Sequence, residues 1–136
     1  MTEDVTRRLL VVANVTVASN MIGPHIDAGT DVLVIAPALN TRLGFWACDD
    51  RRARRHAEER LASSLHSLGV AGIEAEGFVA DADPLLAIED ALQLFDADRI
   101  VISTPSDGRS NWLARGIVER ARDRFAARVE PAPGAL

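Results

Sequence analysis

The chain of 136 residues contains no lysine, so all 15 of its basic residues are arginines. This absence excludes every chemistry that needs a lysine ammonium group, including a phosphate-binding P-loop, a Schiff base and the lysine of a response-regulator receiver. The chain also has a single cysteine, Cys48, which cannot form an internal disulfide. One unpaired cysteine is typical of a protein from a reducing compartment.

Long apolar runs and dense basic patches are also absent. No stretch approaches the roughly 18 consecutive apolar residues of a membrane span. The first residues, MTEDVTRR, lack the basic-then-apolar order of a signal peptide, so we expect a cytoplasmic protein without a membrane partner. The net charge of −5 and the scattered arginines argue against a nucleic-acid partner, because that function depends on a concentrated basic surface.

The sequence does contain an alternation of strand and helix patterns over one domain, residues 1–136. Continuous apolar runs such as LLVVA and VLVIA are typical of strands buried on both faces of a sheet. Segments with apolar residues three and four apart predict helices. We expect strands at about 8–14, 31–37, 73–79 and 99–103, and helices at about 18–26, 49–68, 83–95 and 110–125.

Several element ends carry specific expectations. Asp83 precedes a proline and is predicted to cap a helix, and Gly69 is predicted to end the longest helix. A fifth strand beginning at Arg128 is predicted to be cut short by Pro131 and Pro133. A solvated face with ion pairs along the longest helix is expected of Arg51, Arg52, Arg54, Arg55, Glu58, Glu59 and Arg60.

Alternating strands and helices predict an α/β fold, with an open parallel sheet of four to five strands and helices on both faces. In such sheets ligands bind beyond the carboxyl ends of the strands, where the strand order reverses. The residues at these ends, and therefore the expected ligand contacts, are Ala13, Asn14, Ala36, Pro37, Asp81, Ser103 and Thr104.

The segment 100–113, IVISTPSDGRSNWL, carries the strongest functional signal. A strand, a loop of small and polar residues and a helix follow one another, an order that directs backbone N–H groups and a positive helix end at an anion. The expected anion ligands are Gly108, Arg109, Ser110 and Asn111. The alternative is structural: Gly108 permits a tight turn, and Asp107 or Ser110 caps the helix.

Other candidate residues give weaker signals. Asp81 and Asp83 resemble a carboxylate pair that holds Mg²⁺ beside a nucleotide, although a helix cap is the simpler explanation of Asp83. Asp81 and Asn14 are also candidates for contacts with a ribose or an adenine. The three histidines lack metal-ligand spacing, and the sequence shows no Ser-His-Asp or Cys-His arrangement. We therefore expect no metal site of the chain's own and no catalytic residue.

Together these features resemble the universal stress protein family, from Leu9 to about Phe125. The order of elements is similar, and so is the segment VADADPLLAI at 79–88, with its short strand, acidic turn and proline-initiated helix. The IVIST strand at 100–104 is followed by Gly108 and later by Gly116, where nucleotide-binding members carry a Gly-x-x-Gly-(nine residues)-Gly-Ser/Thr loop. The resemblance implies an adenine-nucleotide-alpha-hydrolase-like fold.

The resemblance also implies a function. It suggests a non-enzymatic protein that binds ATP or another adenine nucleotide, with magnesium only beside a bound nucleotide and with Gly116 as a further residue of the binding loop. Members of the family are commonly homodimers, often joined through the last strand. We expect the two prolines after Arg128 to weaken such a homodimer in this chain.

Departures from the family pattern support alternative functions. Pro105 stands at the position of the first glycine, seven residues instead of nine separate Gly108 from Gly116, and Ile117 replaces the final Ser or Thr. A second hypothesis is therefore a family member that has lost nucleotide binding and acts as a protein-interaction module, with residues 45–46 (Phe-Trp) on its surface. A third is a small enzyme on a related scaffold, for which the sequence offers no convincing nucleophile or general base.

Overall fold

The computed structural model describes residues 7–23, 26, 29–38, 50–80, 83–104, 108–125 and 128–133; for 50, 104, 108–115, 132 and 133 it describes the backbone alone. The strands are β1 (Arg8–Val12), β2 (Asp31–Pro37), β3 (Ala75–Ala80), β4 (Arg99–Thr104) and β5 (Arg128–Pro133). The helices are α1 (Ser19–Ile22), α3 (Asp50–Val70), α4 (Pro84–Leu94) and α5 (Gly108–Arg124).

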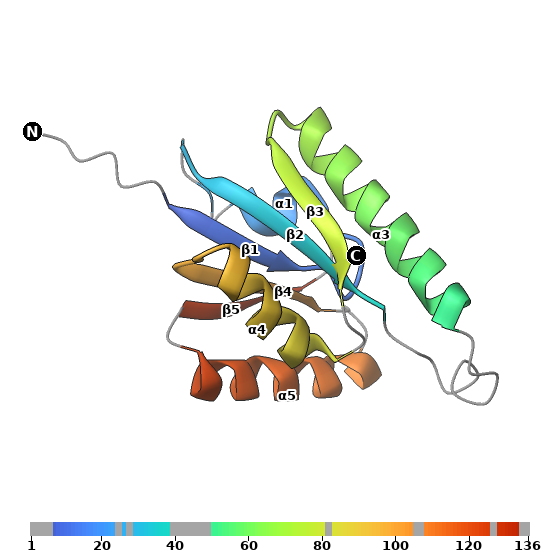
Figure 1. Cartoon of the computed structure of the whole chain (residues 1–136), viewed down its shortest axis with the longest axis vertical. Coiled ribbons are helices and arrows are strands. Elements are labelled where there is room, and N and C mark those ends of the chain that lie inside the picture. The colour runs from blue at the N-terminus through green and yellow to red at the C-terminus, as the bar shows by residue number, and fades with distance from the viewer. Residues whose placement is uncertain are drawn as a thin grey trace, which may run out of the picture.

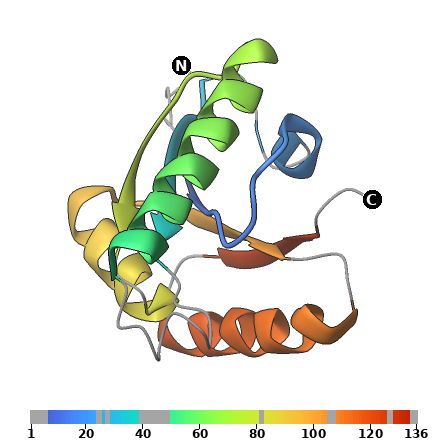
Figure 2. The ribbon, with the colours of Figure 1, turned by 90° about the vertical axis from the view of Figure 1, so that its right-hand side faces the viewer.

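All strand pairs are parallel, and the five strands form one open sheet in the order β3-β2-β1-β4-β5. Helices α1 and α3 pack against one face, and α4 and α5 pack against the other (Figure 1; Figure 2). The predicted α/β class, with a parallel sheet covered on both faces, is confirmed. The strand at the edge beside β2 is β3, as its alternating sequence predicts.

The core consists of two apolar layers, one on each side of the sheet. Side chains alternate along β1, so that Leu9 and Val11 face α1 and α3, whereas Leu10 and Val12 face α4 and α5. Leu10 and Val11 are both 0% exposed, which explains why β1 is apolar at consecutive positions. Each such side chain contributes about 1.5–3 kcal/mol of burial free energy.

The carboxyl end of α3 differs from the sequence prediction. The helix does not end at Gly69 but continues to Val70, and Gly72 adopts the left-handed conformation, with φ of 83°. The Gly72 N–H donates to the Gly69 carbonyl at 3.0 Å. The Ile73 N–H donates to the Leu68 carbonyl at 2.9 Å. These two bonds form a Schellman motif, whose left-handed residue is Gly72 and not Gly69.

The prediction that prolines cut β5 short was wrong, because β5 is a strand of six residues. The Arg128 N–H donates to the Asp98 carbonyl at 3.2 Å, so Arg128 and every second residue after it face β4. Pro131 and Pro133 belong to the other set, whose N–H positions face the open edge, and a proline there removes no bond of the ladder. A homodimer that paired the open edges of two β5 strands would need the backbone N–H donors that Pro131 and Pro133 lack.

Gly77 in β3 marks a close approach between the sheet and α3. A Cβ at this position would lie 2.5 Å from the Val34 carbonyl oxygen and 2.6 Å from Leu61 Cδ1. We predict that Gly77→Ala lowers the free energy of unfolding by about 1–3 kcal/mol, because the backbone must shift. Urea denaturation followed by circular dichroism measures this change.

The matched control is Gly69→Ala, inside α3. A Cβ at Gly69 meets nothing within 4 Å, so alanine there is expected to raise the free energy of unfolding by about 0.5–1 kcal/mol. Equal effects of the two substitutions would contradict the close approach at Gly77.

Candidate functional site

The strand order reverses between β1 and β4. Helix α1 follows β1 and packs on one face, while α5 follows β4 and packs on the other. In parallel sheets such a reversal is where a ligand crevice usually forms, and the region beyond the carboxyl ends of β1 and β4 is therefore the candidate crevice of this chain. The structure brings four predicted site positions to this crevice: Ala13, Asn14, Ser103 and Thr104.

Asn14, two residues after the end of β1, carries the clearest chemical signal at the crevice. Its Oδ1 atom is buried and has no hydrogen-bond partner among the residues that the structure describes. An unsatisfied buried acceptor costs roughly 1–3 kcal/mol. Because almost none of its surface is accessible, a ligand that brings an N–H or O–H group to this atom would remove that cost only after displacing the atoms that cover it.

Ser103 has a structural role at the same place. Its side chain is 0% exposed, and its hydroxyl accepts a hydrogen bond from the Val15 N–H at 3.1 Å. The hydroxyl also lies 3.1 Å from the carbonyl oxygens of Val12 and Val15, to either of which it can donate. Ser103 therefore ties the segment after β1 to β4, and its hydroxyl is engaged inside the protein.

Arg60 of α3 is a residue that sequence reasoning missed. Its Nε donates to the Ala13 carbonyl at 2.7 Å, and its Nη2 donates to the Pro37 carbonyl. The interpretation of Arg60 as part of a solvated face was therefore wrong, since the side chain bridges the carboxyl ends of β1 and β2. Burial lowers the pKa of Arg60 below its ordinary value, and no described carboxylate pairs with it.

Ser64, one turn further along α3, completes this arrangement. Its side chain is 0% exposed; its hydroxyl accepts from the Val17 N–H at 2.8 Å and donates to the Arg60 carbonyl at 2.8 Å. The sequence held a signal for both polar residues. The helical stripe that they share, at spacings of three and four, is Ala53, Ala57, Arg60, Ser64 and Leu68.

The predicted anion ligands 108–111 form the first turn of α5, which begins two residues before its predicted start at Ser110. This turn follows β4, so its N–H groups lie on the carboxyl side of the sheet. Gly116 is eight residues beyond Gly108 inside the same helix, about 12 Å along the axis at 1.5 Å per residue. Gly116 is therefore not brought together with the first turn.

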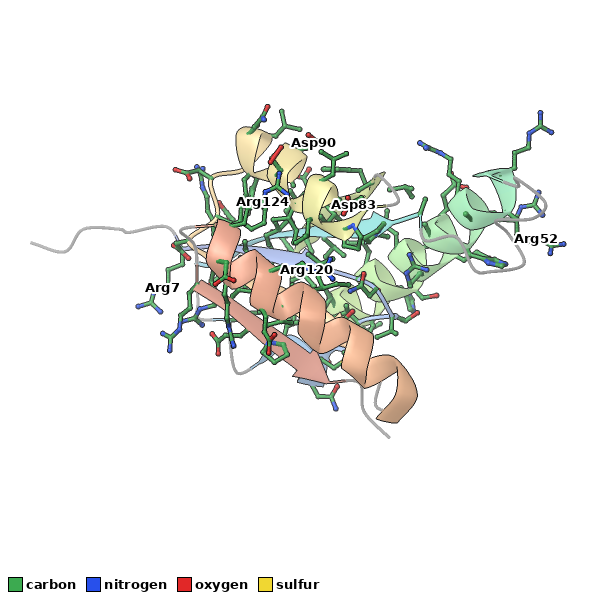
Figure 3. The ribbon with its side chains drawn as sticks, turned by 90° about the horizontal axis from the view of Figure 1, so that it is seen from below. Arg7, Arg52, Asp83, Asp90, Arg120 and Arg124 are labelled. Atoms are coloured by element: carbon green, nitrogen blue, oxygen red, sulfur yellow. The ribbon has the colours of Figure 1, made fainter. Side chains whose placement is uncertain are left out.

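Helix α4 stands beside α5 on the same face of the sheet. Asp83 caps it as predicted, since its Oδ1 accepts from the Leu85 N–H at 3.0 Å and the Leu86 N–H at 3.5 Å. Arg124 reaches from α5 toward α4 (Figure 3). It forms an ion pair with Glu89. The ion pair links α5 to α4.

The remaining predicted positions are less informative. Ala36 is fully buried in β2, and the Pro37 carbonyl accepts from Arg60. Asp81, residues 45–46 and the lone cysteine lie outside the described residues. Within the described part of the chain, no group of three His, Cys, Asp or Glu residues is placed to hold a metal ion. No described helix is both long enough and apolar enough to span a membrane.

No protein-family model matches the chain, and no curated protein matches it.

The bridge made by Arg60 can be tested by its contribution to stability. We predict that Arg60→Met lowers the free energy of unfolding by about 1–3 kcal/mol, because the Ala13 and Pro37 carbonyls lose a charged donor while the apolar stem is kept. Urea denaturation measures the loss, provided that the variant and the unmodified chain have the same m-value. The control is Arg55→Met on the same helix, where the side chain is exposed, with an expected change within about 0.5 kcal/mol. If Arg60→Met left the free energy of unfolding unchanged, the bridge would contribute nothing to stability.

Proposed function

We propose that the chain is a cytoplasmic protein of the universal stress type that binds an adenine nucleotide or a related anion between the carboxyl ends of β1 and β4. In this proposal the protein does no covalent chemistry on the ligand. The observation that carries it is the buried Oδ1 of Asn14, an acceptor without a described partner at the point where the strand order reverses.

The two sides of the crevice favour different chemical groups of a ligand. The first turn of α5 presents backbone N–H groups and a positive helix end, which favour a phosphate. The Asn14 oxygen requires a donor, which phosphate oxygens at neutral pH do not supply. A ligand with phosphates at one end and ribose hydroxyls or an adenine amino group at the other meets both requirements.

Charge at the crevice favours an anion over a neutral ligand. The Arg60 guanidinium lies against the carboxyl ends of β1 and β2, and no described carboxylate pairs with it. A partly desolvated positive charge raises the local potential more than an exposed one does. Arg60 also donates to the Ala13 and Pro37 carbonyls, which makes these two acceptors less available to a ligand.

The direct test is a titration with ATP, ADP and AMP, with and without Mg²⁺, followed by the melting temperature. A nucleotide present at one hundred times its Kd should raise the free energy of unfolding by about 2.7 kcal/mol. We expect magnesium alone to produce no such shift. If no nucleotide shifts the melting temperature, the protein-interaction module becomes the better explanation.

Asn14 variants locate the ligand in this titration. Asn14→Leu should weaken nucleotide binding by about tenfold without lowering the stability of the free protein, because the removed oxygen is a buried acceptor with no described partner. Asn14→Asp keeps an acceptor and should keep most of the binding. Unchanged affinity in Asn14→Leu would place the nucleotide elsewhere.

A second prediction concerns the phosphate end of the ligand. Arg109 lies in the first turn of α5, and we predict that Arg109→Ala weakens ATP binding by about tenfold and leaves adenosine binding unchanged, since a charge-assisted contact to phosphate is lost. Isothermal titration calorimetry separates the two ligands. The control is Arg120→Ala, at an exposed position further along α5. If this variant lost as much ATP affinity as Arg109→Ala, the change in net charge alone would explain the effect.

A further inference from the structure

The backbone on both sides of Asn14 is held by side chains from other elements. On one side, the Ala13 carbonyl accepts from Arg60 Nε of α3 at 2.7 Å. On the other side, the Val15 N–H donates to the Ser103 hydroxyl of β4 at 3.1 Å. Because a peptide group is planar, a bond to one of its atoms orients the whole group. The two bonds therefore constrain both backbone dihedral angles of Asn14.

Further bonds hold the same segment on either side of these two peptide groups. The Ala13 N–H donates to the Ile35 carbonyl of β2 at 2.8 Å. The Val17 N–H donates to the Ser64 hydroxyl of α3 at 2.8 Å. The side chains of Ala13 and Val17 are also buried in the core between the sheet and α3. The segment therefore has little freedom to shift as a whole and carry Asn14 with it.

The two bonds beside Asn14 are shielded from water. Burial lowers the pKa of the Arg60 guanidinium below its ordinary value, yet an arginine stays charged in a protein. A hydrogen bond from a charged donor is about twice as strong as a neutral one. Ser103 is fully buried, and a hydrogen bond away from water is stronger than one in water.

The constraint on Asn14 explains an unusual feature of its side chain. Nearly all buried polar atoms in proteins have a hydrogen-bond partner, and a residue between two elements can usually turn toward water to find one. Asn14 lies between β1 and α1, but its Oδ1 stays buried without a described partner. The bonds at Ala13 and Val15 oppose the backbone rotation that would relieve this acceptor.

We propose that Arg60 and Ser103 are positioning residues, which hold the Asn14 acceptor unsatisfied until a ligand donates to it. The inference rests on the proposed function, because it concerns the same crevice. A ligand gains little when it replaces water at an acceptor, whereas at an unsatisfied acceptor it removes the whole desolvation cost. The fold carries this cost in the free protein, as binding sites with stored strain do.

The test is a double-mutant cycle of Asn14→Leu and Arg60→Met, measured on the full chain by urea denaturation without any ligand. In the unmodified chain, Asn14→Leu should raise the folding equilibrium constant about tenfold, because an apolar side chain of similar size replaces an unsatisfied acceptor. In the Arg60→Met background the gain should fall below about twofold, because Asn14 has already turned toward water. Equal gains in the two backgrounds, or no gain in the unmodified chain, would overturn the proposal.

Ser103→Ala gives a second background for the same measurement. It removes the bond to the Val15 N–H and leaves Arg60 in place, so it decides the question if Arg60→Met does not fold. The gain from Asn14→Leu should again fall below about twofold, for the same reason. A gain that stays tenfold in Ser103→Ala would contradict the proposal.

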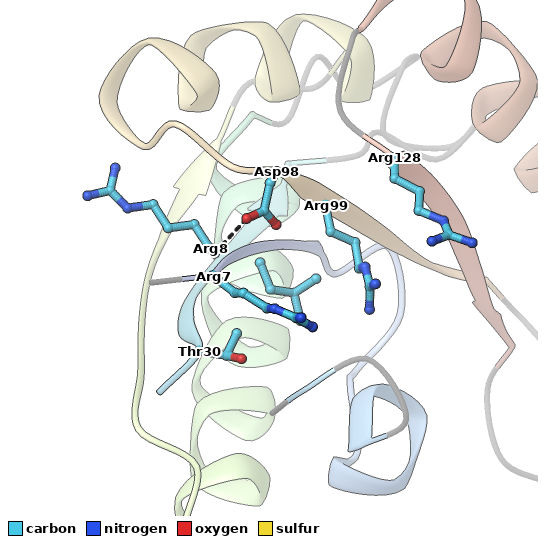
Figure 4. Close-up of a pocket in the computed structure, with 7 residues that line it drawn as sticks. Arg7, Arg8, Thr30, Asp98, Arg99 and Arg128 are labelled. Atoms are coloured by element: carbon cyan, nitrogen blue, oxygen red, sulfur yellow. Dashed lines mark hydrogen bonds between the residues drawn. The ribbon is translucent and has the colours of Figure 1, made fainter. Parts of the chain in front are cut away.

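The matched control lies at the other end of the same strand pair. There the Asp98 Oδ2, just before β4, accepts from the Arg8 backbone N–H at 3.4 Å (Figure 4). Arg8 is six residues before Asn14, roughly 20 Å along an extended chain. Asn14→Leu should therefore give the same tenfold gain in an Asp98→Ala background as in the unmodified chain. A smaller gain there would mean that any loosening of β1 releases Asn14, against the proposal.

Adenosine binding tests the consequence for the ligand. Adenosine is uncharged, so the charge of Arg60 does not attract it directly. In calorimetric titrations, Arg60→Met should weaken adenosine binding about tenfold in the chain with Asn14, because the ligand then replaces water at the acceptor. In the Asn14→Leu chain, Arg60→Met should change the adenosine Kd by less than about twofold. Equal weakening in both chains would reduce Arg60 to a structural role.

The two proposals fail in distinguishable ways. If neither adenosine nor any nucleotide binds and the cycle without ligand still shows coupling, the nucleotide proposal falls and the hold on Asn14 stands. If nucleotides bind and the cycle is additive, the nucleotide proposal stands and the positioning role of Arg60 and Ser103 falls.

Discussion

The parallel pairing of β1 with β4 is the interaction on which the rest of the structure depends. Both strands are buried on both faces, in a register that sets Leu9 opposite Arg99 and Val12 opposite Ile102. This pairing places the reversal of strand order at the middle of the sheet. It therefore brings Ser103 to the segment that contains Asn14, at the carboxyl ends of the two strands.

The segment between β1 and α1 shows how side chains replace backbone partners beyond a strand end. The N–H groups of Val15 and Val17 donate to the hydroxyls of Ser103 and Ser64, which come from opposite sides of the segment. Helix α1, with only four residues, is too short to be stable alone. It is held by the bonds of the segment that precedes it and by the burial of Met21 and Ile22.

The fold could be predicted because each strand and helix is indicated by the residue pattern of its own segment. Continuous apolar runs mark buried strands, alternation marks the edge strand β3, and all five predicted strand positions are occupied by strands. The wrong prediction for β5 depended on information that no single segment carries. Whether Pro131 breaks a strand depends on which way its N–H position faces, and that is decided by the register with β4.

The site was less predictable for a similar reason. The role of Arg60 depends on two carbonyl groups at distant strand ends, although its place on the buried stripe of α3 was a usable signal. The bonds that hold the backbone beside Asn14 join residues separated by 47 and 88 positions. Ser103 was visible in the sequence as a polar residue at a strand end, but its bond to the segment after β1 required the strand order.

The proline-bearing edge of β5 has a consequence for assembly. The sheet has two edges, and β3, whose segment contains no proline, is the one with a full set of backbone donors. An edge that can pair only with another copy of itself gives a closed two-fold pair, whereas pairing of β3 with β5 of the next chain would continue without limit. Pro131 and Pro133 obstruct that second mode, so the fold carries its own protection against growing into a fibre.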